Sequence, residues 1–282
     1  MSERVLKVYD DAAVMAKEVA HRTLQAVIDA EHSTDGRYDI GLTGGSDSIQ
    51  ALKDMASDSL VRVIDWSRVH FWWGDERFVS AVDPDRNALQ ARRAFLGGLV
   101  EQGLLPESNI HEMAADRRSV EQASRAEDEE NDQLVSQAAV QYARELIHQL
   151  GPAGATPSQA EAVTCIKPLD LLVLGMGPDG HFGSLFPAPA HHEIEVTDRL
   201  VVGVTHSPKM PPLRVSLSAP FMARSTRTWM MTKGAGKAHA TAGVFSRRDN
   251  PEFPSSFADG AEEFIWFTTP DTLAETSVDN RR

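Results

Sequence analysis

The sequence predicts an α/β fold built around a mostly parallel sheet. Short apolar runs alternate along the chain with longer segments in which apolar residues recur at helical spacing. The run Leu169–Leu174 is almost wholly apolar, which is typical of a central strand that is covered on both faces of a parallel sheet. The length of 282 residues is sufficient to bury a sizeable core.

The strand predictions rest on runs rich in β-branched, aromatic and other apolar residues, bounded by turn residues. In order, the predicted strands are Val5–Tyr9, Tyr38–Thr43, Val69–Trp73, Leu169–Leu174, Arg199–Thr205, Leu213–Leu217, Thr228–Thr232 and Glu263–Phe267. Three of these strands run directly into glycines, at Gly44, Gly74 and Gly175. We therefore expect tight turns at the carboxyl ends of these three strands.

The helix predictions rest on apolar periodicity and on capping residues. Asp10 or Asp11 is expected to cap the first helix, whose apolar residues are Ala16, Val19, Ala20, Leu24, Val27 and Ile28. Further helices are predicted from the Gly44-Gly45 turn to near Met55, from Asn87 to about Leu105, over Ala138–Leu150 and over Ala235–Phe245. Gly151 and Pro152 are expected to end the helix at Ala138–Leu150.

Charge and composition narrow the classes of partner. The net charge of −13 disfavours nucleic acid and anionic membranes, so an anionic substrate would require basic residues concentrated at its site. No apolar run approaches the ~20 residues that span a bilayer. Cys165 is the single cysteine, which excludes an intramolecular disulfide and suggests a cytoplasmic location.

One segment is densely acidic. Residues Glu121–Asp132 read "EQASRAEDEEND", within an insertion at about 116–134. We interpret this segment as a solvated helix face or a mobile surface loop. The last residues, 277–282, are expected to form a frayed tail.

The segment "LGMGPDGHFGSLFP" contains a Gly-x-Gly-x-x-Gly pattern directly after a predicted strand. A dinucleotide cradle would need a full helix after the turn, yet Pro187 and Pro189 leave space for about two helical turns. Asp179 would also place negative charge near a pyrophosphate. We reject the cradle and interpret Asp179 and His181 as an acid–base pair at the carboxyl end of a central strand. The alternative is a histidine that merely satisfies a local hydrogen bond.

The segment "GLTGGSDS" also leads from a strand into a helix. Gly44, Gly45 and Ser46 could bring free backbone N–H groups to an anion at the start of that helix. An ordinary N-cap by Ser46 or Asp47 explains the same residues about equally well. The charge of Asp47 opposes the binding of an anion.

Basic residues lie in two further loops. The segment "VHFWWGDERFV" places Asp75, Glu76 and Arg77 directly after a strand, and Arg77 can bind a phosphate through two hydrogen bonds. In "SPKMPPLR", prolines stiffen the loop that carries Lys209 and Arg214. A salt-bridged turn is the alternative for the first loop.

Two other motif interpretations fail. The segment "GAGK" at Gly234–Lys237 lacks the leading glycine and the Ser or Thr of a phosphate-binding P-loop, so we interpret it as a helix start. His181, His191 and His192 lack the ligand spacing of common metal sites, and structural roles are favoured for the last two. The sequence therefore predicts no metal.

Five segments in this order resemble the 6-phosphogluconolactonases, in a broader group that includes glucosamine-6-phosphate deaminases and ribose-5-phosphate isomerase-like folds. They are "LTGGS", "WGDER" with Asn87 beyond it, "LGMGPDGH" with "SLFP", "SPKMPPLR" and "GAGKA", spanning about residues 40–240. The deaminases look instead like "DGHIAFNEP" and "MDEY" at the corresponding places. Two dipeptides depart from the common lactonase pattern: Asp47-Ser48 stands where Thr-Pro is common, and Phe182-Gly183 where Thr-Ala is common.

The resemblance implies a single domain over residues 1–282, Rossmann-like, with helices on both faces of the sheet. It implies hydrolysis of 6-phospho-D-glucono-1,5-lactone to 6-phospho-D-gluconate, in the oxidative pentose phosphate pathway, without a cofactor. His181 would activate water and protonate the leaving ring oxygen, and Asp179 would orient it. The substrate-binding residues that it implies are Gly44, Gly45, Ser46, Asp75, Arg77, Lys209 and Arg214.

Two alternative functions stay open at this stage: a deaminase or isomerase acting on an amino-sugar phosphate, and a sugar-phosphate sensor without catalytic activity. The expected partner is a small sugar phosphate, with no nucleic acid and no membrane. The expected assembly is a monomer or a small homo-oligomer.

Overall fold

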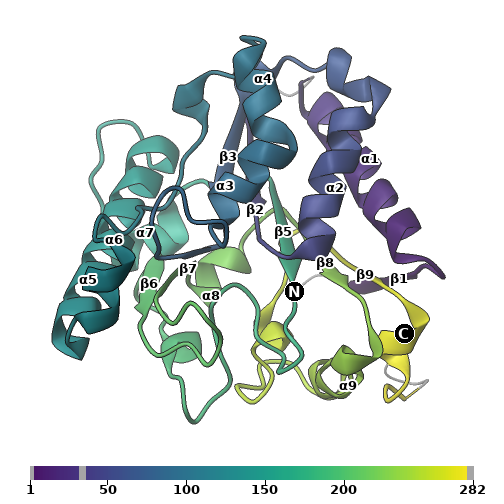
Figure 1. Ribbon diagram of the computed structural model, residues 1–282. Coiled ribbons are helices and arrows are strands. Elements are labelled where there is room, and N and C mark those ends of the chain that lie inside the picture. Colours follow the sequence, from purple (N-terminus) through teal and green to yellow (C-terminus); the bar gives the residue numbers. More distant parts are fainter. Residues whose placement is uncertain (1–2, 32–35, 278–282) are drawn as a thin grey trace.

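The computed structural model describes residues 3–31 and 36–277, so the tail expected at 277–282 lies outside this part of the chain except for Ser277. Its centre is a six-stranded sheet in the order β1-β9-β8-β5-β2-β3, in which every neighbouring pair is parallel (Figure 1). These strands are β1 (Arg4–Val8), β2 (Tyr38–Leu42), β3 (Val69–Trp73), β5 (Leu171–Gly175), β8 (Arg227–Thr232) and β9 (Glu263–Thr268). The predicted α/β class is confirmed.

Helices flank this sheet (Figure 1). The longer ones are α1 (Ala12–Glu31), α2 (Ser46–Ser57), α6 (Asp128–Leu150) and α9 (Ala238–Ser246). Shorter ones are α5 (Val120–Arg125), α7 (Gln159–Cys165) and α8 (Ala219–Met222). Asp11 caps α1 as expected, because its Oδ1 accepts a hydrogen bond of 2.6 Å from the N–H of Ala13. In the described part of the chain, no helix is long and apolar enough to cross a membrane.

The helix predicted from Asn87 to about Leu105 is continuous but not uniform. It consists of α3 (Asn87–Ala91), a π-helical turn (Arg92–Leu96) and α4 (Gly97–Glu101). The π turn inserts an extra residue where Arg92 reaches out to two carboxylates, those of Glu107 and Glu112. The helix begins beside the candidate site and directs its first residue, Asn87, towards it.

A second sheet was not predicted. It is antiparallel, in the order β4-β7-β6, and consists of β4 (Asp75–Arg77), β6 (Val201–Val204) and β7 (Arg214–Leu217). The predicted strands at 199–205 and 213–217 exist, but they belong to this sheet and not to the parallel one. Its register places Arg77 directly opposite Arg214, so two cationic side chains from distant parts of the sequence become neighbours.

The acidic insertion is helical. Residues of its densest part form α5, which is capped reciprocally by Ser119 and Gln122, and the first turns of α6. Most of these residues are exposed. The interpretation as a solvated helix face is therefore confirmed.

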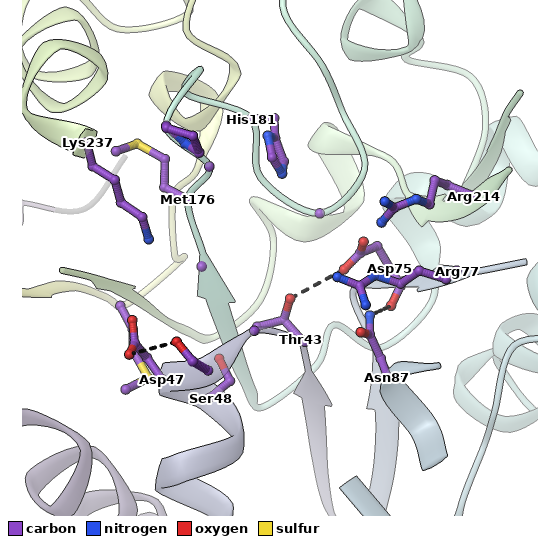
Figure 2. Close-up of a pocket in the computed structure, with 18 residues that line it drawn as sticks. Thr43, Asp47, Ser48, Asp75, Arg77, Asn87, Met176, His181, Arg214 and Lys237 are labelled. Carbon is purple, nitrogen blue, oxygen red and sulfur yellow. Dashed lines mark hydrogen bonds between the residues drawn. The ribbon is translucent and has the colours of Figure 1, made fainter. Parts of the chain in front are cut away.

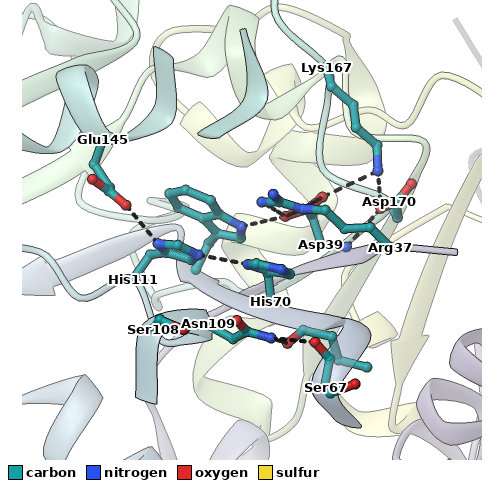
Figure 3. A network of polar contacts seen from close by, with 12 residues as sticks. Arg37, Asp39, Ser67, His70, Ser108, Asn109, His111, Glu145, Lys167 and Asp170 are labelled. Atoms are coloured by element: carbon teal, nitrogen blue, oxygen red, sulfur yellow. Dashed lines mark hydrogen bonds and ion pairs between the residues drawn. The ribbon is translucent and has the colours of Figure 1, made fainter. Parts of the chain in front are cut away.

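A buried carboxylate fixes the amino-terminal half of strand β2. Asp39 is fully buried, and its oxygens accept hydrogen bonds from Arg37 at 2.8 and 3.0 Å and from Trp72 Nε1 at 2.9 Å (Figure 3). Lys167 adds an ion pair at 3.2 Å. Burial raises the pKa of Asp39, but the contacts with Arg37 and Lys167 outweigh burial and lower it overall.

A histidine pair continues this network along β3. His111 stacks on Trp72 at 3.9 Å between ring centroids and joins His70 at 2.9 Å and Glu145 of α6 at 2.9 Å (Figure 3). Burial lowers the pKa of His70 to about 4, so its ring is neutral near pH 7. The network links β2, β3 and α6.

Candidate active site

A cleft of about 270 Å³ lies at the carboxyl ends of β2, β5 and β8 and beside the small sheet (Figure 2). This is the edge at which ligands bind in open parallel α/β sheets. Its lining residues are Thr43, Gly44, Gly45, Ser46, Asp47, Ser48, Asp75, Arg77, Asn87, Gly175, Met176, Gly177, Pro178, His181, Gly183, Arg214, Met231 and Lys237. The three glycine turns that the sequence predicts after strands therefore lie around one cleft. Gly44 and Gly175 line it directly, and Asp75 lines it immediately after Gly74.

The turn after β5 carries the predicted acid–base pair. The N–H of Gly177 donates to the carbonyl of His181 at 2.9 Å, and Gly180 adopts a positive φ of 84°. A Cβ atom on Gly177 would lie 2.1 Å from the His181 ring, so only glycine permits this ring position. The turn thereby holds the imidazole against the cleft.

His181 and Asp179 are in direct contact. His181 Nδ1 lies 2.5 Å from Asp179 Oδ1, which leaves Nε2 as the ring nitrogen available to the cleft. Phe186 packs on the ring at 4.6 Å between centroids. Burial raises the pKa of Asp179, but the hydrogen bond with His181 and the charge of Lys209 lower it overall, so this carboxylate is ionised near pH 7.

The start of α2 forms another wall of the cleft. The cap residue is Gly45, with φ 97°, so the alternative of a side-chain cap by Ser46 or Asp47 is wrong. The first N–H groups of a helix have no partner within it, and here they lie in the cleft wall. Gly44 is equally constrained, because a Cβ there would lie 2.0 Å from Asn87 Oδ1.

The small sheet supplies two arginines and a buried aspartate. Asp75 accepts hydrogen bonds from Ser184 Oγ at 2.7 Å and from Thr43 Oγ1 at 3.3 Å. Arg214 is held by the carbonyls of the proline loop, including Pro211 at 2.7 Å, and burial lowers its pKa to about 10. Arg77 Nη1 donates to the carbonyl of Asp85 at 2.6 Å.

Two buried polar atoms in the cleft wall have no hydrogen-bond partner among the described residues. They are Arg77 Nε and Asn87 Oδ1. These two atoms are exceptions to the usual pairing of buried donors and acceptors in folded proteins, and both are closed off from the open part of the cleft.

Two lysines, Lys209 and Lys237, lie at or near the cleft. Lys209 Nζ lies 3.8 Å from Asp179 Oδ1, beside the acid–base pair. Lys209 is not among the described residues that line the cleft. Lys237, interpreted only as part of a helix start, lines the cleft and points towards α2 (Figure 2). The pKa of Lys237 is lowered overall, because the effect of burial exceeds the opposing effect of the nearby Asp47 carboxylate. Lys237 follows β8 at the carboxyl edge of the sheet, and this position is the sequence signal that marks it as a candidate ligand-binding residue.

Glu76 supports the cleft from behind. It is buried, and its carboxylate accepts hydrogen bonds from the backbone N–H groups of Arg77 at 2.8 Å, Asn87 at 2.7 Å and Ala88 at 2.8 Å. Arg86 Nε lies 4.0 Å away. Glu76 thus ties β4 to the start of α3, and burial raises its pKa to about 7.

Glu76→Gln should change the pH dependence of stability. The pKa of Glu76 is near 4.5 when exposed and about 7 in the folded chain, so the folded state binds this proton more tightly. The contribution of this group to stability is therefore complete at low pH and is lost as pH rises through about 7. Relative to wild type, the variant should gain on the order of 2 kcal/mol in free energy of unfolding between pH 5 and pH 8. Urea titrations at several pH values measure this difference, and a pH-independent difference would contradict it.

The other histidines of this region have partners of their own. His191 Nδ1 lies 3.7 Å from Glu193, and His192 Nδ1 lies 3.2 Å from Glu195. Within residues 3–31 and 36–277, no group of three or more His, Cys, Asp or Glu side chains is arranged to hold a metal ion.

Comparison with known proteins identifies the family of the chain. A family model described as glucosamine-6-phosphate isomerases/6-phosphogluconolactonase matches residues 10–266. A protein of Streptomyces coelicolor named 6-phosphogluconolactonase is 35% identical over 261 residues, which cover 93% of this chain and 90% of that protein. One of the same name from Mycobacterium leprae is 33% identical, with 96% of this chain and 97% of that protein covered.

The fold agrees with these matches. The crystal structure of 6-phosphogluconolactonase from Leishmania guyanensis superimposes with a TM-score of 0.79 at 22% identity, covering 98% of this chain and all (100%) of that one. The family model and the relatives together span the strands and turns that form the cleft. The chain belongs to the glucosamine-6-phosphate isomerase/6-phosphogluconolactonase family.

Proposed function

We propose that the protein hydrolyses 6-phospho-D-glucono-1,5-lactone to 6-phospho-D-gluconate, in the oxidative pentose phosphate pathway. The observation that carries this proposal is the His181–Asp179 pair, at 2.5 Å, in the same cleft as the uncapped start of α2. The names of the relatives at 33–35% identity support the same reaction.

In the proposed reaction, His181 acts as a general base. Asp179 bonded to Nδ1 orients the ring, so Nε2 takes a proton from a water molecule as that water attacks the lactone carbonyl carbon. The tetrahedral oxyanion then collapses, and the bond between the carbonyl carbon and the ring oxygen breaks. The imidazolium of His181 returns the proton to that ring oxygen, and the product is an open-chain carboxylic acid, which ionises.

The phosphate is proposed to bind at the start of α2. The N–H groups that follow Gly44, Gly45 and Ser46 favour an anion, and Lys237 adds a positive charge from the facing side. Arg77 and Arg214 bring further cations from the small sheet. Lys209 would act on Asp179 and its ring partner, in place of the phosphate contact that the resemblance implies.

Asp75 is proposed to bind sugar hydroxyls. It is buried and already accepts from two hydroxyl groups, those of Thr43 and Ser184. Asn87 Nδ2 donates to the backbone carbonyl of Asp75 at 3.0 Å, so Asn87 holds the backbone of this aspartate beside the cleft.

The direct test is a lactone-consumption assay with freshly generated 6-phospho-D-glucono-1,5-lactone. The lactone hydrolyses spontaneously, so the enzyme must raise the rate above this background in proportion to its concentration. Acid release that is the same with and without protein, together with ammonia release from glucosamine 6-phosphate, would refute the proposal in favour of a deaminase.

Arg77→Ala should chiefly raise KM, by about tenfold, because a cation of the cleft wall is lost while the acid–base pair is intact. Arg93→Ala, on the π-helical turn outside the cleft lining, removes the same charge and is the matched control. Steady-state kinetics on both variants separates KM from kcat. An unchanged KM in Arg77→Ala would exclude Arg77 from substrate binding.

A further inference from the structure

Asp47 places a carboxylate at the phosphate end of the cleft. It is the second residue of α2, it lines the cleft, and its side chain is only 12% exposed (Figure 2). Near the start of a helix such a charge is favourable for the helix itself. It is unfavourable for an anionic ligand that binds to the N–H groups at the start of α2.

The carboxylate of Asp47 is paired with a lysine. Lys233, which follows β8 directly, contacts Asp47 Oδ1 through its Nζ. The Lys233 side chain is 40% exposed, and it lies outside the set of described residues that line the cleft. Asp47 therefore engages a cation that is close to the phosphate end but does not face into it.

Asp47 also acts on the cation that does line the cleft. Lys237 is part of the lining, and the negative charge of Asp47 stabilises its ammonium form. A phosphate bound between α2 and Lys237 would lie close to this carboxylate, and both anions would attract the ammonium group of Lys237. The two negative charges repel each other across this end of the cleft.

We propose that Asp47 is a specificity-determining residue that weakens the preference of the cleft for a phosphorylated over an unphosphorylated sugar lactone. This inference rests on the proposed lactone hydrolysis. A phosphate dianion is repelled by Asp47, whereas the hydroxyl group of an unphosphorylated lactone carries no charge and is not. Asp47 therefore acts on one substrate and not on the other.

The test compares Asp47→Asn with wild type on two substrates, 6-phospho-D-glucono-1,5-lactone and D-glucono-1,5-lactone. The amide preserves the size of the side chain and removes its charge. For the phosphorylated lactone we expect KM to fall on the order of tenfold with kcat nearly unchanged. For the unphosphorylated lactone, kcat/KM should stay within about twofold of wild type, because the effect is purely one of charge.

A matched control is available on the same helix. Asp54→Asn makes the same chemical change two turns along α2, where the carboxylate accepts from Gln50 at 2.9 Å and lies outside the cleft lining. This variant should leave the kinetics with both lactones unchanged. Lys233→Gln, which leaves the charge of Asp47 uncompensated, should raise KM for the phosphorylated lactone alone.

The outcomes separate the two claims. If wild type accelerates the hydrolysis of neither lactone, the proposed function fails. If wild type is active, but Asp47→Asn leaves the ratio of the two kcat/KM values unchanged or lowers it, the function stands and the role of Asp47 is overturned. Equal changes for both substrates in Lys233→Gln would likewise contradict a charge effect that is confined to the phosphate.

Discussion

Replacing His181 by alanine should lower kcat by about 10²–10⁴-fold, the usual contribution of a general base. The fold should persist, because the ring is partly exposed at the cleft and lies outside the hydrophobic core, with Phe186 packed against it. Circular dichroism and thermal unfolding check the fold, and the lactone assay measures kcat. His192→Ala is the matched control, since this neighbouring histidine is exposed and pairs with Glu195.

The partner of the histidine provides a second measurement of the same claim. Asp179→Asn preserves the shape of the side chain, but an amide can donate a hydrogen bond to Nδ1 of His181. The ring proton would then lie on Nε2, which could no longer accept a proton from water. We expect kcat to fall with little change in KM. Near-normal turnover of the His181→Ala variant would end the assignment of the base, whatever the effect at Asp179.

Lys237→Ala should raise KM by about 100-fold, because the proposed phosphate site at the start of α2 loses its facing ammonium group. The charge of Lys237 acts equally in the ground state and the transition state, so kcat should change little. Lys53→Ala on the exposed side of α2 removes the same charge away from the cleft and should be neutral. A fall in kcat with unchanged KM would instead place Lys237 at the reacting carbonyl.

Much of the central sheet could be predicted from the sequence because its signals are local. An apolar run such as Leu171–Gly175 indicates a buried strand on its own, and a glycine directly after it indicates a turn at the carboxyl edge. The His181–Asp179 pair could also be predicted from the sequence, because the two residues are two positions apart on one rigid turn.

The small sheet could not be predicted in the same way. β4 has only three residues, all charged, and shows no apolar alternation. Its partner β7 begins at Arg214, far along the chain, so the pairing of Arg77 with Arg214 depends on tertiary contacts that no local pattern reports. Tertiary contacts likewise place Lys209 Nζ 3.8 Å from Asp179 Oδ1, which no local pattern reports.

Lys237 was missed for a different reason. The segment Gly234–Lys237 does not match a P-loop, and on local pattern alone it indicates a helix start. Its position after β8 carries the information, because every strand of the parallel sheet ends at the same edge. A basic residue a few positions after such a strand is a candidate ligand for an anion bound at that edge.

The central claim is that one sugar phosphate spans the cleft from the start of α2 to His181. A crystal structure of the protein with 6-phospho-D-gluconate tests it most directly. We expect the phosphate on the N–H groups at the start of α2 with Lys237 beside it, and the C1 carboxylate within hydrogen-bond distance of His181 Nε2. A phosphate bound next to His181, or a product bound outside the cleft, would contradict it.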